Sequence, residues 1–363
     1  MLTRFVPGIR ALAFAGERIL CAEKNRLFLT DYDLKAVAKC AVLPISVRRK
    51  LLQYCRLTER IFRVSVHAPL ISFWGDFLCV WEGEVLSMNL STGVVAREFT
   101  LPPRRKALYL SNVVGVAGFD NVVAFGEYWA NPNNLSTSIW ARGRNSSKWE
   151  IVFAFADGEI EHIHNIVPDP YRNAVWILTG DFGNASALWR AFDNFGRVDL
   201  FARGQQVHRA AWLHCLPDRL IYATDTQMER NSLCEVRFEG NETTIIKKGA
   251  LPASSIYYSP SKGEVVFSTV VEPPPPTGRF LADMLALTRG AGIESDLAHI
   301  FSVSDAGVVT ELFAAAKDQL PARLAQFGSF SFPAGVNPSR RIYAYCTALA
   351  GLDGGTLIID RGR

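Results

Sequence analysis

Residues 161–203 read EHIHNIVPDPYRNAVWILTGDFGNASALWRAFDNFGRVDLFAR. Four segments of this stretch, HIHNIVPDP, AVWILTGD, SALWRAF and RVDLFA, are rich in the β-branched and aromatic residues that strands favour. Turn-forming runs such as YRN and DNFG separate them. This alternation of strand and turn predicts a meander of four short antiparallel strands.

The same order recurs along the chain, although the repeats share almost no sequence identity. The next stretch reads HRAAWLHCL, PDR, LIYATDT, a loop, SLCEVRF, EGNE and TTIIKKGAL. The stretch before reads YLSNVVGVAG, FDN, VVAFGEY, a loop, TSIWAR, GRNSS and KWEIVFAF. Seven such units fit at a spacing of about 50 residues, which is typical of propeller blades. We therefore predict an all-β fold, a seven-bladed β-propeller of four-stranded antiparallel blades, in a single domain over residues 1–363.

The two ends of the chain complete this prediction. The last unit has only three strands, whereas the N-terminal residues MLTRFVP are left over. These residues can pair with the last unit as its fourth strand. We expect this N-terminal strand to close the ring, because closure removes an open sheet edge.

Long connections gather on one face of the predicted disc. Within each unit, the turns from first to second strand and from third to fourth strand are short and rich in Gly, Asp, Asn, Pro and Ser. Two insertions, 45–62 and 271–298, fall on the opposite face. We expect a helix in the first and a helical middle in the second. Long polar loops on a rigid scaffold often carry function, so this face is the predicted working face.

Chemically capable side chains are predicted on the same face, around the mouth of the central channel. Those at or near the starts of innermost strands are His67, His162, His164, His208, Arg209 and Gln326. Those at the ends of second strands are Glu127, Tyr128, Asn131, Asp181, Asp225, Glu229, Glu272 and Asp353. Their convergence on one opening is the main functional indication in the sequence.

Composition excludes several classes of partner. A formal net charge of +4 over 363 residues is too small and too dispersed to indicate nucleic acid binding. No apolar stretch is long enough to span a bilayer, and the N-terminus lacks the pattern of a signal peptide. The seven scattered cysteines include no CxxC pair, so we expect reduced thiols and a cytoplasmic protein, unless a leader was removed. The oligomeric state stays open.

Six segments carry a resemblance to a known family: GEYWANP, EHIHNIVPDPYRNAVWILTGD, YATDTQMERN, FSTVVEP, LAQFGSFSFP and ALAGLDGGTL. With these segments in this order, the chain from about residue 60 to 360 resembles bacterial BNR-like or sialidase-like β-propeller proteins. The resemblance implies the propeller fold, a glycosidase-like activity and a link to polysaccharide metabolism, and it transfers no catalytic residue. More distantly, seven-bladed polysaccharide lyases use channel His, Tyr and Arg, an analogy of fold alone.

Histidine and arginine are the first candidates for chemistry. His162 and His164 are two residues apart on a strand, so both side chains point to one face, and imidazole suits proton transfer near neutral pH. The alternative is that they bind loop carbonyl groups. Arg209 could pair with a substrate carboxylate, or instead with a channel carboxylate such as Asp225. Trp176, Trp189 and Trp212 are predicted to be core.

Acidic and aromatic residues complete the candidate set. Glu127, Asp225 and Glu272 follow apolar strands and offer the carboxylates that a glycosidase needs; alternatively, Asp225 caps a loop and Glu272 is a solvated flank. Tyr128 could contact a sugar or pack between blades. We assign catalytic roles to His162, His164, Glu127, Tyr128, Asp225 and Glu272. We assign substrate binding to His67, Asn131, Asp181, His208, Arg209, Glu229, Gln326 and Asp353.

No cofactor is expected. The sequence contains no phosphate-binding loop, dinucleotide fingerprint or nucleophile elbow. We also expect no metal; a divalent ion held by His162, His164, His67 or His208 with Gln326 is the less favoured alternative, because no local spacing motif supports it.

These features favour a carbohydrate-active enzyme, a glycoside hydrolase or polysaccharide lyase, that acts on an acidic bacterial poly- or oligosaccharide at the channel mouth. The alternative is a non-catalytic propeller that binds a glycan or protein in a polysaccharide-assembly system. The enzyme predicts convergent charged groups with perturbed pKa values. The binding protein predicts a broad exposed apolar rim on the face of the long loops.

Overall fold

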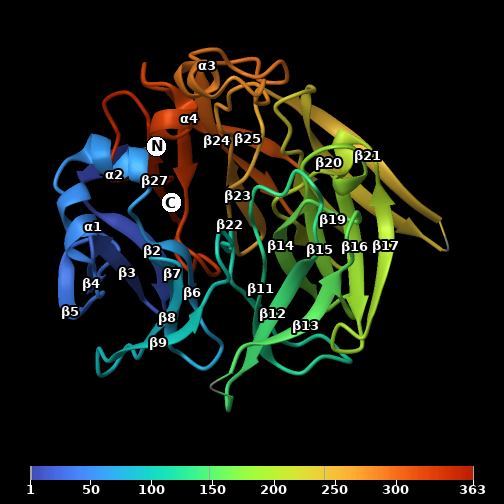
Figure 1. The fold of residues 1–363 in the computed structure, drawn as a ribbon, viewed down its shortest axis with the longest axis horizontal. Coiled ribbons are helices and arrows are strands. Elements are labelled where there is room, and N and C mark those ends of the chain that lie inside the picture. The colour runs from blue at the N-terminus through green and yellow to red at the C-terminus, as the bar shows by residue number, and fades with distance from the viewer. Residues whose placement is uncertain (1, 147, 241, 363) are drawn as a thin grey trace.

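The computed structural model describes residues 2–146, 148–240 and 242–362. These residues form seven four-stranded antiparallel sheets arranged in a ring, and the sheets follow one another around the ring in chain order (Figure 1). The prediction of a seven-bladed β-propeller is confirmed.

Each blade is a meander whose strands run outward from the channel. Blade 1 contains β2 (Arg10–Ala15), β3 (Arg18–Glu23), β4 (Arg26–Thr30) and β5 (Ala36–Val42); blade 2 contains β6 (His67–Ile71), β7 (Phe77–Trp81), β8 (Glu84–Met88) and β9 (Val95–Thr100); blade 3 contains β10 (Ser111–Val113), β11 (Val122–Gly126), β12 (Thr137–Gly143) and β13 (Glu150–Phe155). Blade 4 contains β14 (His162–Asp169), β15 (Ala174–Gly180), β16 (Ala187–Phe192) and β17 (Arg197–Arg203); blade 5 contains β18 (His214–Cys215), β19 (Arg219–Ala223), β20 (Asn231–Glu239) and β21 (Glu242–Leu251). Blade 6 contains β22 (Tyr258–Ser261), β23 (Glu264–Ser268), β24 (Leu297–Ser304) and β25 (Val309–Ala316); blade 7 contains β26 (Ser329–Ser331), β27 (Arg341–Thr347), β28 (Gly355–Asp360) and β1 (Leu2–Pro7).

The N-terminal strand closes the ring, as predicted. β1 pairs antiparallel with β28 over its whole length, from Leu2 opposite Asp360 to Pro7 opposite Gly355. Both ends of the chain therefore lie in the same blade, and they are close together in Figure 1. The edge of β28 is covered, which removes a site for unwanted strand pairing.

The core lies between neighbouring blades. Trp176 and Trp212 are fully buried and Trp189 is nearly so, as predicted. One apolar cluster joins Ile139 of blade 3 to Ile163 and Ile177 of blade 4, and similar clusters join the other blades. Such close packing fixes each blade against the next, which gives the channel mouth a rigid frame.

Some innermost strands, such as β18, are shorter than the sequence indicates. The segment 208–216 was expected to be one strand, but only His214 and Cys215 form β18. The preceding residues form a short 3-10 turn, η2 (Gln206–His208), and Arg209 O accepts a hydrogen bond from Asp225 N at 3.0 Å. Arg209 is thus held by a loop contact rather than by a strand ladder.

The helices lie on the face where the innermost strands begin. The segment 45–62 forms two short helices, α1 (Val47–Leu52) and α2 (Arg56–Phe62), rather than one. The segment 271–298 contains α3 (Phe280–Leu285), and α4 (Ala322–Ala325) precedes blade 7. Within the described residues, no helix has the length and hydropathy needed to cross a bilayer. All seven cysteines are free thiols.

Candidate functional site

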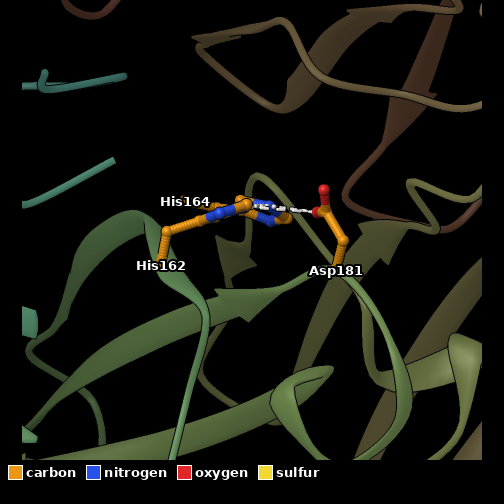
Figure 2. A group of neighbouring side chains, drawn as sticks. All are labelled: His162, His164 and Asp181. Atoms are coloured by element: carbon orange, nitrogen blue, oxygen red, sulfur yellow. Dashed lines mark hydrogen bonds and ion pairs between the residues drawn. The ribbon is translucent and has the colours of Figure 1, made fainter. Parts of the chain in front are cut away.

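Two histidines and an aspartate converge beside the channel mouth. His162 begins β14, His164 lies two residues further along, and Asp181 directly follows β15. Figure 2 shows both imidazole rings directed at the Asp181 carboxylate. His164 Nε2 lies 3.0 Å and His162 Nε2 3.3 Å from Asp181 Oδ1, and the two Nε2 atoms are 3.1 Å apart.

Local backbone features bring the two rings together. The pairing of β14 with β15 shifts register between Ile163 and Asn165, so His164 is the extra residue of a β-bulge. Bulges re-aim side chains, often next to active sites. Gly180 leaves the space for the ring, because a Cβ atom there would collide with the His164 imidazole.

The hydrogen bonds of the two rings fix their tautomers. His162 Nδ1 lies 3.1 Å from Trp129 O, and His164 Nδ1 lies 2.9 Å from Ala210 O. A carbonyl oxygen only accepts hydrogen bonds, so each Nδ1 carries a proton. In the neutral rings, both Nε2 lone pairs therefore face the Asp181 carboxylate.

Three lone-pair donors at these distances match the first coordination sphere of a divalent cation. Ligands bound to one ion at about 2.1 Å in tetrahedral or octahedral geometry lie roughly 3.0–3.4 Å apart. The three distances between the ligand atoms fall within this range. In the part of the chain that the structure describes, this group is the one set of three His, Cys, Asp or Glu side chains arranged to hold a metal. The expectation of no cofactor is therefore not confirmed.

Arg209 supplies positive charge to the same cluster. Its Nη2 lies 3.0 Å from Asp181 Oδ1 and 3.8 Å from Asp225 Oδ2, and its Nη1 donates to Gln227 Oε1 at 2.7 Å. Burial alone would raise the pKa of the Asp181 carboxyl, but the Arg209 guanidinium, followed by the histidines when they are protonated, outweighs burial and lowers it well below its usual range. Asp181 is therefore ionised at neutral pH.

Two further carboxyl groups, Asp225 and Glu272, are buried nearby. Burial, followed by the negative charge of Asp225, raises the pKa of Glu272 to about 7, against the opposing effect of Arg209. Ser254 Oγ donates to Glu272 Oε2 at 2.6 Å. Burial likewise raises the pKa of Asp225, although Arg209 opposes the shift. Glu272 is thus able to exchange a proton near neutral pH.

Tyr128 lies against the two histidine rings and is only half-buried. Its ring packs on His162, with centroids 4.4 Å apart. Burial, and then the charges of Asp181 and Asp225, raise the pKa of its phenol. Tyr128 therefore keeps its proton and can act as a donor.

Several buried polar atoms around the cluster have no hydrogen-bond partner among the described residues. They are Arg209 Nε, Asp225 Oδ1 and Gln206 Oε1. Buried polar groups are rarely left unpaired in folded proteins. Their presence around one opening indicates a place for water or a polar ligand.

Three predicted site residues form hydrogen bonds and ion pairs within the protein. The Glu127 carboxylate accepts from Arg105 at 2.8 Å, Ser138 N at 3.0 Å and Trp140 Nε1 at 3.1 Å. Asn131 bonds the backbone of its own loop and of Glu161. Asp353 accepts from Arg56 Nε at 3.0 Å and Nη2 at 2.9 Å, which ties α2 to blade 7.

Four other predicted residues lie outside the cluster. His67 Nε2 contacts Arg63 O at 3.3 Å on the blade 2 side of the mouth. Glu229 is exposed and lines a shallow pocket of about 420 Å³ between blades 4 and 5, with Phe182, Gln206 and Lys247. The remaining two are His208 at the end of η2 and Gln326 at the end of α4.

Some residues of the cluster escaped the sequence analysis. Glu161 Oε2 accepts from Asp181 N at 3.2 Å, and Gln206 Nε2 donates to Asp181 O at 3.0 Å. Ser254 and Gln227 hold Glu272 and Arg209, as described above. Glu161 adjoins His162 in the sequence and could have been found there, whereas the other three lie in loops that show no periodic pattern.

Known proteins resemble this chain in fold but not in sequence. No protein-family model and no curated protein matches it. Among solved structures, an oligogalacturonate lyase in complex with manganese has a TM-score of 0.59 at 9% identity, over 96% of this chain and 87% of that chain. An oligogalacturonate lyase from Vibrio parahaemolyticus has a TM-score of 0.55 at 10% identity, over 96% and 88%. A chain of a mitotic checkpoint complex has a TM-score of 0.57 at 9% identity, over 100% and 94%.

These similarities support the seven-bladed propeller. At such low identity they show the fold alone, since one fold hosts many unrelated functions. No family match supports the BNR-like or sialidase-like resemblance in particular.

Proposed function

We propose that this protein is a carbohydrate-active enzyme that cleaves an acidic oligosaccharide at the channel mouth by β-elimination. The observation that carries the proposal is the convergence of His162, His164 and Asp181 beside Arg209, Asp225 and Glu272. The similarity of the fold to oligogalacturonate lyases supports elimination over hydrolysis by analogy.

His162 Nε2, His164 Nε2 and Asp181 Oδ1 are the atoms that would hold a divalent cation, and one lyase with this fold was solved with manganese. When bound, such an ion would supply positive charge that makes the C–H bond next to a substrate carboxylate more acidic. Arg209 keeps Asp181 ionised, and the carbonyl groups of Trp129 and Ala210 keep both Nε2 lone pairs directed inward.

Elimination needs a base and an acid, and the chain offers both. Glu272 would remove the proton from the carbon that bears the carboxylate, because a group with a pKa of about 7 both accepts and releases protons at neutral pH. The electron pair of that C–H bond forms the C=C bond, and the C–O bond to the leaving sugar breaks. Tyr128 would give its proton to the departing oxygen, and exchange with solvent restores both groups.

The proposal is tested by incubating the purified protein with uronic-acid oligosaccharides in the presence of Mn²⁺. Elimination gives a conjugated unsaturated uronate that absorbs in the ultraviolet, together with a new reducing end. We expect His164→Ala, Glu272→Gln and Tyr128→Phe each to lower the rate by about a hundredfold or more, and the control His214→Ala to leave it unchanged. New reducing ends without absorbance would show hydrolysis instead. Wild-type activity of the three site variants would refute these roles.

A second candidate function, a non-catalytic glycan-binding propeller, is favoured by a separate observation. Neither α1 nor α3 has a buried residue, and Val47, Tyr54 and Phe280 are 78%, 87% and 73% exposed. Exposed apolar side chains of this kind on the face of the long loops are compatible with a binding surface. Tight oligosaccharide binding with no product, lost on substitution of Tyr54 and Phe280 but not of His164, would identify this function.

A further inference from the structure

The channel mouth has a second side, formed by blades 1, 2 and 3, that carries positive charge. Arg10 begins β2, the innermost strand of blade 1. Arg63 directly follows α2, four residues before His67 begins β6 of blade 2. Lys106 precedes β10 of blade 3. Because all innermost strands of the ring begin on one face, these residues are placed around the same opening as His162 and Arg209.

Within the described residues, none of these three cations has an acidic partner; Arg63 and Lys106 are exposed, and Arg10 is partly buried. Within residues 2–146, 148–240 and 242–362, no carboxylate lies within ion-pair distance of Arg10, Arg63 or Lys106, whereas Arg60 and Arg209 each contact two. Arg10 Nη1 donates to Val66 O at 2.8 Å, and Arg63 Nη2 reaches only Arg323 O at 3.5 Å. No direct ion pair therefore offsets their charge; Arg10 lies 5.1 Å from the centroid of the Tyr345 ring and within range of the charge of Glu59.

The cations also act on one another. Lys106 is exposed to solvent, but partial enclosure by the surrounding protein, followed by the charge of Arg63, lowers its pKa. Solvent still reaches His67, but enclosure by the surrounding protein, and then the charges of Arg10 and Lys106, lower its pKa to about 4. Like charges held together without a counter-ion oppose the folded state, so their assembly is explained most directly by a negatively charged ligand.

Backbone pairing connects this basic side to the candidate catalytic side. Lys106 and Tyr128 form an isolated antiparallel bridge, with N–O distances of 2.9 and 2.8 Å. Tyr128 in turn packs on His162. A ligand bound by Lys106 would therefore extend across Tyr128 towards the three metal-ligand atoms.

We propose that Arg10, Arg63 and Lys106 form an anion subsite that binds a second acidic group of the substrate, while the first lies at His162, His164 and Asp181. The enzyme would then select oligosaccharides in which acidic sugars are neighbours, and would discriminate against a single acidic sugar in a neutral chain. The identity of the ligand rests on the function proposed above, but the presence of an anion subsite does not.

Calorimetric binding of oligogalacturonate, its methyl ester and a sulfated oligosaccharide tests the subsite. We expect the acidic chain to bind more tightly than its ester, and Lys106→Gln and Arg63→Gln each to raise its Kd by about tenfold. The matched control is Lys39→Gln, which removes an exposed lysine of β5 that also lacks a carboxylate partner in the described residues. Melting curves establish that each variant is folded.

The outcomes separate the subsite from the reaction. Charge-dependent binding that requires Lys106 and Arg63, without any product, would support the subsite and overturn the proposed reaction. Turnover with KM unchanged in both variants would overturn the subsite and leave the reaction standing. Failure of every acidic probe to bind, or equal losses in Lys39→Gln, would also overturn the subsite.

Discussion

At the scale of single residues, the candidate site depends on a glycine. Gly180 ends β15 and faces the His164 imidazole so closely that no side chain fits between them. The tight donor set of two Nε2 atoms and one carboxylate oxygen exists only because His164 occupies that space. A glycine at this position allows the His164 ring to approach the backbone closely.

Gly180→Ala is predicted to displace the His164 ring and to abolish the metal site. Calorimetry with Mn²⁺ should show binding to the wild type and at least a tenfold weaker affinity for the variant, since one of three protein ligands is misplaced. Gly249→Ala, in the outer strand β21 of blade 5, has no neighbour within 4 Å of its added atom and no positive φ, so it serves as the comparison. Unchanged Mn²⁺ affinity in Gly180→Ala would contradict the assignment.

Glu272 is predicted to make stability depend on pH. Its carboxyl titrates at about 7 in the folded protein but has an ordinary pKa of 4.5. Between these values folding takes up a proton, so the free energy of unfolding falls as the pH rises through this window. Glu272→Gln should stabilise the protein at neutral pH by roughly 1–3 kcal/mol and flatten the dependence.

Thermal melts of the wild type and of Glu272→Gln between about pH 5 and pH 8 measure this effect. Glu229→Gln removes an exposed acid on the same face and should leave the pH profile unchanged. Parallel profiles for the wild type and Glu272→Gln would mean that Glu272 does not hold a proton near neutrality.

At the scale of elements, α2 is fixed to blade 7 by ion pairs. Arg56 and Arg60 of α2 both reach Asp353, and Arg60 also contacts Asp318. Burial would raise the pKa of Asp353, but its bonds to Arg56 outweigh burial and lower it. The Asp353 carboxylate therefore joins α2 to blade 7, which closes the ring, and its role is structural.

Asp353→Asn is predicted to lower the free energy of unfolding by about 1–3 kcal/mol, because it removes half of a two-bond contact and leaves Arg60 with one partner fewer. Activity per folded molecule should be unchanged. Chemical denaturation together with the elimination assay measures both. A loss of substrate affinity without a loss of stability would instead support the substrate-binding role predicted from the sequence.

At the scale of the whole molecule, much of the fold was predictable because it follows from local patterns. In blade 4, the predicted segment 162–170 corresponds to β14 and the segment 174–181 to β15, each within one residue. Ring closure by residues 2–7 followed from counting strands. The lengths of innermost strands such as β18 could not be predicted in this way. Loop contacts at the channel mouth interrupt the hydrogen bonding between these strands and their neighbours.

The candidate site was only partly predictable, for the same reason. His162, Asp181 and Arg209 were placed at the mouth because each begins or follows a predicted strand. Glu127 was indistinguishable from Glu272 in sequence, since both follow an apolar strand. Arg105, the partner of Glu127, lies in a loop, and the path of a loop leaves no periodic pattern in the sequence. The basic side of the mouth went unnoticed because Arg10, Arg63 and Lys106 lie in three different blades.

The ring brings residues that are far apart in the sequence to one opening. There the basic side of the mouth faces the side that carries the histidines and carboxylates. A crystal structure of the Glu272→Gln variant with Mn²⁺ and an acidic oligosaccharide tests this arrangement most directly. We predict a metal ion at His162, His164 and Asp181, with the sugar chain passing Tyr128 towards Lys106. Oligosaccharide bound away from the channel mouth, or a metal ion absent from the three ligand atoms, would contradict it.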